Sequence, residues 1–172
     1  PPSATPSASV TATATLTASQ TPTMAPTETL TYTPVPGKNI QANEIVAYFV
    51  QTNTGGPIGC GDTLVPIRTG LYRTGNTVED LRAALNYLFR ASNYVLGLYN
   101  ATYTSSLQAG EIDFNKSSGT AITRLSGSYV PPLTKCDGHR YREQVWATAY
   151  QFDAIRDFTP YVGGKLLGDR LY

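Results

Sequence analysis

The sequence is poor in the residues that build metal sites and nucleophile sites. Its 172 residues include only 2 cysteines, 1 histidine, 1 methionine and 1 tryptophan. The single His139 lies three residues after Cys136, and no second cysteine pair is nearby to complete a zinc site. A nucleophilic serine needs a histidine base, and neither a second histidine nor a GxSxG motif is present. We therefore expect no metal, no cofactor and no enzyme activity.

Charge of one sign and long apolar runs are missing as well. The chain carries 13 Lys and Arg against 12 Asp and Glu, without the dense basic cluster that neutralises phosphates, which disfavours nucleic-acid binding. Its longest apolar runs, such as Ile45–Val50, fall far short of the roughly 20 residues that span a bilayer. The chain begins in low-complexity sequence, as would a mature form whose signal segment has been removed. We expect membrane contact only through a lipid anchor lost with that segment.

What is present first is a tract rich in Thr, Pro, Ser and Ala. Up to Pro36 its only ionisable side chains are Glu28 and Tyr32, and large apolar residues are few. Such a segment buries too little apolar surface to offset the entropy of ordering it, and its composition favours extended conformations. We predict a disordered low-complexity linker over residues 1–40 and one folded domain of roughly 130 residues over 41–172.

The two cysteines, Cys60 and Cys136, are predicted to form a disulfide. An even pair beside a Ser/Thr/Pro-rich stalk is typical of an extracytoplasmic protein. Closing a loop of this length stabilises a fold by roughly 4 kcal/mol in the chain-entropy model. The alternative is two buried thiols.

The domain has the hydrophobic periodicity of alternating strands and helices. A capping box predicts Thr77 as the N-cap of the first helix, and Asp137 is interpreted as the N-cap of the second. The order predicts an α+β fold, a single small domain in which two main helices pack on one face of a mixed or antiparallel sheet. The expected strands are Glu44–Gln51, Thr63–Leu71, Leu107–Asn115, Thr120–Gly127 and Phe158–Val162, and the expected helices are Thr77–Phe89 and a segment from about residue 137 to Phe152.

Several local features refine this order. The apolar first strand should lie inside the sheet, whereas Pro66 places the second strand at an edge or a bulge. A bend is expected near Gly110, and the pair Gly163 and Gly164 should reverse the chain after the last strand. Residues 93–106 show no sustained period, so we expect an irregular crossing segment there.

Tyrosine is the residue type that most suggests a binding surface. Tyr94, Tyr99 and Tyr103 cluster in the crossing segment, and Trp146 flanks the apolar stripe of the second helix. Rigid aromatic rings with a polar group serve binding surfaces well. We predict these four residues as partner-binding positions; packing in the core is the alternative.

Asp62 and Asp137 each lie next to a cysteine, so a disulfide would bring the two carboxylates together. With His139 they are the best candidates for acid–base chemistry in a hydrolase. The alternative for Asp62 is a loop turn, and the alternative for His139 is a solvated position in the first turn of a helix. We favour these alternatives.

The order of short motifs resembles the GerMN domain of bacterial envelope and sporulation proteins over about residues 42–172. The matching places are Leu64–Ile67, Leu81–Leu88, Leu125–Ser126, Gln151–Phe152 and Gly163–Lys165. The resemblance implies a noncatalytic interaction or structural module of the bacterial cell envelope, secreted or lipid-anchored, which binds a protein or cell-wall partner. The alternatives are a carbohydrate- or peptidoglycan-binding module that uses exposed aromatic residues, and a hydrolase.

Overall fold

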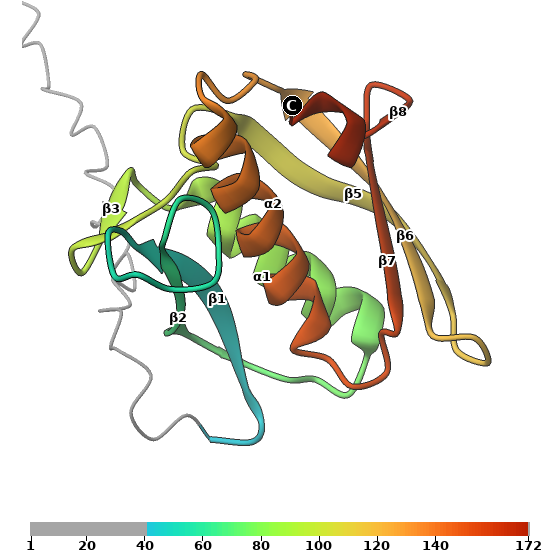
Figure 1. The fold of residues 1–172 in the computed structure, drawn as a ribbon. Helices are drawn as coiled ribbons and strands as arrows, with labels where there is room; N and C mark the ends of the chain where they lie inside the picture. The colour runs from blue at the N-terminus through green and yellow to red at the C-terminus, as the bar shows by residue number, and fades with distance from the viewer. Residues whose placement is uncertain (1–40, 172) are drawn as a thin grey trace, which may run out of the picture. The chain divides into compact units, whose positions relative to one another are not determined.

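The computed structural model describes residues 41–171 (Figure 1). The linker predicted for residues 1–40 lies outside the described residues. The α+β class and both main helices are confirmed. The strands are β1 Glu44–Gln51, β2 Thr63–Tyr72, β3 Tyr94–Val95, β4 Leu98–Tyr99, β5 Ser106–Asn115, β6 Thr120–Ser128, β7 Asp157–Val162 and β8 Lys165–Leu166; the helices are α1 Thr77–Arg90, α2 Lys135–Tyr150 and the short 3-10 helix η1 Gly168–Arg170.

The strands form two sheets, where the sequence predicted one. The first has the order β2-β1-β4-β3 and is antiparallel. The second has the order β5-β6-β7-β8 and is mixed, because β6 and β7 run parallel and α2 makes the crossover between them. Each long hairpin, β1–β2 and β5–β6, pairs within itself, and the two helices lie between the hairpins (Figure 1).

Both helices bury side chains on more than one side, which is why two sheets can share them. Helix α1 contacts β1, β2 and β5, and α2 contacts β1 and β7 as well as α1. One continuous core results. Its largest fully buried members come from both sheets and both helices: Phe49, Ile45 and Ile67 from the first sheet, Leu81, Leu85 and Leu88 from α1, Tyr141 and Val145 from α2, and Leu107 from β5.

The N-terminus of α1 differs from the prediction by one residue. Asn76, not Thr77, is the N-cap, and its Oδ1 accepts hydrogen bonds from the backbone N–H groups of Val78 and Glu79 at 3.1 and 3.4 Å. Asp80 does not complete a capping box with Thr77, because its Oδ1 instead accepts hydrogen bonds from the backbone N–H and the hydroxyl of Thr74.

Helix α2 begins earlier than predicted. Its N-cap is Thr134, so Asp137 is the third helical residue and not the cap. The Thr134 Oγ1 accepts a hydrogen bond from the Asp137 N–H at 3.1 Å and donates one to the Asp137 carboxylate at 2.9 Å. The apolar stripe expected for the second helix, which runs from Tyr141 through Val145, Thr148 and Ala149 to Phe152, is buried as predicted, although Phe152 lies just beyond the end of α2.

Polar side chains of α2 and of its C-cap residue cover the edge of β1 opposite β2, along the stretch that β4 does not pair. The Gln151 amide bonds both backbone groups of Val46, at 2.9 and 2.8 Å. At Tyr48, the N–H donates to the Thr148 hydroxyl and the carbonyl accepts from the Gln144 amide. Two residues farther along, Val50 pairs with Tyr99 of β4. Strand β1 is therefore interior, as predicted. On the edge opposite β2, its backbone is bonded partly by β4 and partly by side chains of α2 and its C-cap.

The remaining local expectations can be compared directly. Strand β2, with Pro66, lies at an edge of its sheet, and β5 has a register irregularity between Ala109 and Ile112, as expected near Gly110. Gly163 and Gly164, both with positive φ, reverse the chain from β7 into β8. The crossing segment expected to be irregular contains β3 and β4, joined by a turn at Leu96 and Gly97.

Candidate functional site: a tyrosine row beside the disulfide

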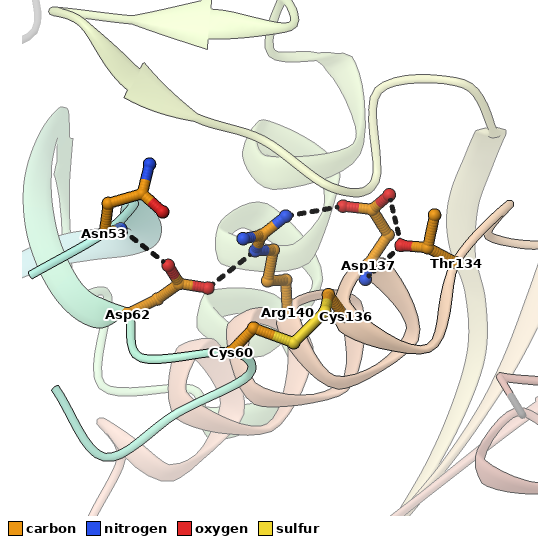
Figure 2. Close-up of a disulfide and its surroundings, with 7 residues drawn as sticks. All are labelled: Asn53, Cys60, Asp62, Thr134, Cys136, Asp137 and Arg140. Carbon is orange, nitrogen blue, oxygen red and sulfur yellow. Dashed lines mark hydrogen bonds and ion pairs between the residues drawn. A yellow bond between two sulfur atoms is a disulfide. The ribbon is translucent and has the colours of Figure 1, made fainter. Parts of the chain in front are cut away.

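The disulfide joins the loop between β1 and β2 to the first turn of α2. Cys60 and Cys136 are bonded, with their Cα atoms 5.5 Å apart, as the sequence predicted (Figure 2). No free cysteine occurs. The bond therefore fixes the start of α2 against the loop that joins the two strands of the β1–β2 hairpin.

Asp62 is a fully buried carboxylate next to this bond. Its Oδ1 accepts a hydrogen bond from the Asn53 N–H at 2.9 Å, and its Oδ2 accepts one from the Arg140 Nε at 2.7 Å (Figure 2). Burial acts to raise the pKa of Asp62, but the hydrogen bonds from Arg140 and Asn53, together with the positive charge of Arg140, outweigh it and hold the pKa below its ordinary value. Asp62 is therefore an ionised structural anion.

Arg140 lies between the two carboxylates that the sequence paired. Its Nη1 bonds Asp137 at 3.0 Å while its Nε bonds Asp62, so Asp62 and Asp137 face the same guanidinium and not a common cleft (Figure 2). His139 is exposed on α2. The two carboxylates thus lie close together, as predicted. Both bind Arg140, a contact that the sequence did not predict.

Three of the four predicted binding residues form a row. The rings of Tyr94 and Tyr99 have centroids 5.7 Å apart, and those of Tyr99 and Tyr103 are 6.3 Å apart. Tyr94 is 60% exposed and Tyr103 is 44% exposed, whereas Tyr99 between them is half-buried. We call these three residues the tyrosine row. The arginine network supports its centre, because the Arg140 guanidinium lies 5.7 Å from the Tyr99 ring centroid.

The hydroxyl of Tyr99 is kept protonated by its surroundings. Burial raises the pKa of Tyr99 to about 12, and the negative charge of the nearby Asp137 adds to the rise. The Tyr99 hydroxyl therefore stays protonated beside the Asp137 carboxylate, at the disulfide end of α2.

Trp146 does not join the row. It is half-buried on α2, where its ring packs edge-on against Phe158 of β7 at 5.8 Å and the Arg142 guanidinium lies 5.3 Å from its centroid. These contacts place it on the side of α2 that faces the second sheet.

Two hollows flank the end of α1 and meet the outer tyrosines of the row. The first, about 610 Å³, is lined by the end of α1 from Ala83 onward, by Leu71, and by residues 91, 92 and 94–96; Tyr94 is in its wall, and we call it the Tyr94 hollow. The second, about 450 Å³, is lined by residues 89–93 and 103–108; Tyr103 is in its wall, and we call it the Tyr103 hollow. Arg90, Ala91 and Ser92 line both.

The described part of the chain, residues 41–171, contains no group of three His, Cys, Asp or Glu side chains that could hold a metal ion. Within the same residues, no helix is long and apolar enough to span a membrane.

Among solved structures, the tandem GerMN domains of the sporulation protein GerM from Bacillus subtilis are similar to this chain, with 14% sequence identity and a TM-score of 0.49. The match covers 75% of this chain and 42% of that one, so the chain spans less than half the length of that structure. No family model and no curated protein sequence matches the chain. That structure consists of GerMN domains, the same domain family that the order of motifs in the sequence resembles. The function of this chain is therefore inferred from its own residues.

Proposed function

We propose that the domain is a noncatalytic binding module of the bacterial cell envelope, held outside the membrane. In this proposal a protein or a cell-wall component binds the tyrosine row, Tyr94, Tyr99 and Tyr103. The order of GerMN-like motifs along the sequence favours the envelope setting. The observation that carries the proposal is the exposure of this row.

Tyrosines usually enter the core or lie singly on a surface, whereas these three are in ring contact and stay accessible at both ends. Tyrosine supplies a large rigid contact area at a small cost in side-chain entropy, which suits a binding surface. The disulfide and the network around Arg140 brace the central ring, so the row is held in place before any partner arrives.

The noncatalytic part of the proposal rests on how the candidate acids are used. A general acid or base must reach a substrate, but Asp62 is fully buried and both its oxygens accept hydrogen bonds from the protein. Asp137 is bound by Arg140 and by Thr134. A hydrolase built on Asp62, Asp137 and His139 would need this network to open.

The extracytoplasmic location is supported by the disulfide. Disulfides persist in oxidising compartments and are rare in the cytosol, where thiols are kept reduced. The bond between Cys60 and Cys136 includes every cysteine of the chain, which fits a protein that matures outside the cytoplasm.

A specific observation favours a glycan as the second candidate for the partner. Aromatic rings exposed in a row are suited to stacking on sugar rings, and the row is flanked by two hollows large enough for small ligands. Burial of all three tyrosines would have argued against this candidate.

The proposal is tested by retention on the envelope. The full chain is incubated with an envelope fraction that contains membrane and peptidoglycan, and the bound fraction is measured after sedimentation. We expect the double variant Tyr94→Ser/Tyr103→Ser to bind at least about tenfold more weakly, because aromatic residues at the centre of an interface carry much of its binding energy.

The chain offers a matched control in two other exposed tyrosines, Tyr72 at 54% and Tyr150 at 44% exposure. The variant Tyr72→Ser/Tyr150→Ser removes the same number of rings away from the row, and it should be retained like the unaltered chain. Equal retention of both double variants, with both folded by circular dichroism, would refute the proposal.

A further inference from the structure

Arg90 is the one charged residue that the two hollows share. It lies at the end of α1, exposed, in the wall of both the Tyr94 hollow and the Tyr103 hollow. Neither hollow has an Asp or Glu among the described residues that line it. One helical turn before Arg90 lie Asn86 and Tyr87, so α1 itself offers no carboxylate at pairing distance.

The guanidinium of Arg90 makes no hydrogen bond, ion pair or ring contact with another of residues 41–171. Two carbonyl groups at the end of α1 accept hydrogen bonds from other side chains: Asn100 Nδ2 donates to the carbonyls of Leu88 and Ala91, and the Thr102 hydroxyl also donates to Leu88. Among residues 41–171, therefore, no group occupies the donors of Arg90, and no carboxylate lines the two hollows beside it.

The wall of the Tyr103 hollow also contains an acceptor that has no partner among the described residues. The Oδ1 of Asn93 is buried and accepts no hydrogen bond within the described residues, and Asn93 lines the Tyr103 hollow. Buried polar atoms are nearly always paired, so this oxygen favours a ligand that brings a hydroxyl or an N–H.

The rim of the Tyr94 hollow is conformationally strained. Leu96, at the turn between β3 and β4, has a φ of 52° and is 48% exposed. A branched residue in the left-handed region costs free energy that a simple turn would avoid with Asn or Gly. Strain of this kind is commonly retained at binding sites, and here it presents an apolar side chain at the edge of the hollow.

We infer that the two hollows together bind a carboxylate-bearing saccharide. In this arrangement sugar rings stack on Tyr94 and Tyr103, the carboxylate lies between them on the Arg90 guanidinium, and a hydroxyl or N–H of the sugar donates to Asn93. Arginine binds carboxylates in bidentate geometry, which suits a cation that has no partner among residues 41–171. One arginine is too few for a nucleic-acid backbone, and a neutral glycan would leave it unused.

This inference rests on the proposed function and narrows its partner, so the test separates the two. The probes are peptidoglycan glycan strands freed of stem peptides, which keep one lactyl carboxylate per disaccharide, the same strands methyl-esterified, and a neutral chitin oligosaccharide of equal length. Binding to the full oxidised chain is measured by calorimetry, and by amide shifts at Ser92 and Asn93.

We expect the free-acid strands to bind at least about tenfold more tightly than either neutral probe, and Arg90→Gln to remove that preference. Arg156→Gln is the matched control, because Arg156 is also exposed but lies before β7, outside both hollows. It should leave binding unchanged.

Three results would overturn the inference. The first is equal binding of charged and neutral probes, and the second is equal loss in the two arginine variants. The third is binding only of strands that retain stem peptides, which would assign the hollows to a peptide. If Tyr94→Ser/Tyr103→Ser loses envelope retention while Arg90→Gln keeps it, the proposed function stands and the carboxylate is wrong. If neither variant loses retention, the proposed function fails first.

Discussion

A single carboxylate, Asp62, connects the loop between β1 and β2 to α2 through Arg140. Because Asp62 is fully buried, removing its charge leaves the guanidinium of Arg140 with only Asp137. We predict that Asp62→Asn destabilises the oxidised domain by about 3 kcal/mol, the low end for a buried ion pair because one partner remains. Urea unfolding measures this loss.

The control is Asp113→Asn. Asp113 also forms an ion pair at 2.7 Å, with Arg124, but both side chains are more than half exposed. We expect the control to cost less than about 1 kcal/mol. Comparable losses in the two variants would show that the Asp62 pair is not the structural link described above.

The same carboxylate predicts a pH dependence. The pKa of Asp62 is lower in the folded state than its ordinary value of 3.8, so its contribution to stability is full above that value and is lost as the pH falls through the folded pKa. The free energy of unfolding of the natural domain should therefore fall more steeply than that of Asp62→Asn between about pH 5 and about pH 2. Parallel curves would contradict the lowered pKa.

Single residues also show where sequence reasoning ends. Asn76 and Thr77 are both good N-cap residues and are adjacent, so the sequence could not decide between them, and the structure selects Asn76 because Asp80 is bound to Thr74. The proximity of Asp62 to Asp137 could be predicted from the two cysteines. The ion pair between Arg140 and Asp62 could not, because the two residues are 78 positions apart and no local sequence pattern shows where a long side chain points.

At the scale of elements, buried polar side chains of α2 take part in its contact with β1. Gln144 is fully buried; it donates to the Tyr48 carbonyl and accepts from the Ala101 N–H at 2.7 Å. Gln144→Leu would leave both backbone groups without a partner. We predict a loss of about 3 kcal/mol in the free energy of unfolding, since each such group costs about 1 to 3 kcal/mol.

The matched control for this variant is Gln108→Leu. Gln108 lies on β5 with its side chain exposed, so the same change there should alter stability by less than about 0.5 kcal/mol. Thermal unfolding of both variants is sufficient. A mild effect of Gln144→Leu would mean that water replaces the side chain at the edge of β1.

Elements with a strong period were predictable, and elements that depend on distant pairing were not. The apolar stripes predicted both helices, and the apolar composition of β1 predicted its interior position in the sheet. The burial of Gln144 was not predicted, because a sequence pattern indicates a buried helix face through its apolar residues alone. Strands β3 and β4 have two residues each, too short for any alternation. The division into two sheets depends on which hairpin meets which helix, a long-range property that local sequence does not encode.

At the scale of the whole molecule, the disulfide is the main covalent constraint. It joins positions 76 residues apart. In the chain-entropy model, closing such a loop stabilises the fold by roughly 4 kcal/mol. We predict that the double variant Cys60→Ser/Cys136→Ser is destabilised by up to this amount, and that reductant lowers the melting temperature of the natural domain but not of the variant.

Alkylation followed by intact-mass measurement supplies the independent check. Both cysteines should resist alkylation in the native protein until reductant is added. Rapid reaction of both thiols without reductant would contradict the bond and would remove its support for an extracytoplasmic location.

The loop that the disulfide closes has a mechanical consequence. If tension pulls residues 41 and 171 apart, the load passes through the bond between Cys60 and Cys136, and the segment from β2 to β6 lies outside the load path. That segment cannot be drawn out, so the fully stretched domain is shorter by roughly 250 Å than its reduced form. Only the chain before Cys60 and after Cys136 can lengthen. The tyrosine row lies within the shielded loop, so a partner bound there would stay on chain that the tension does not straighten.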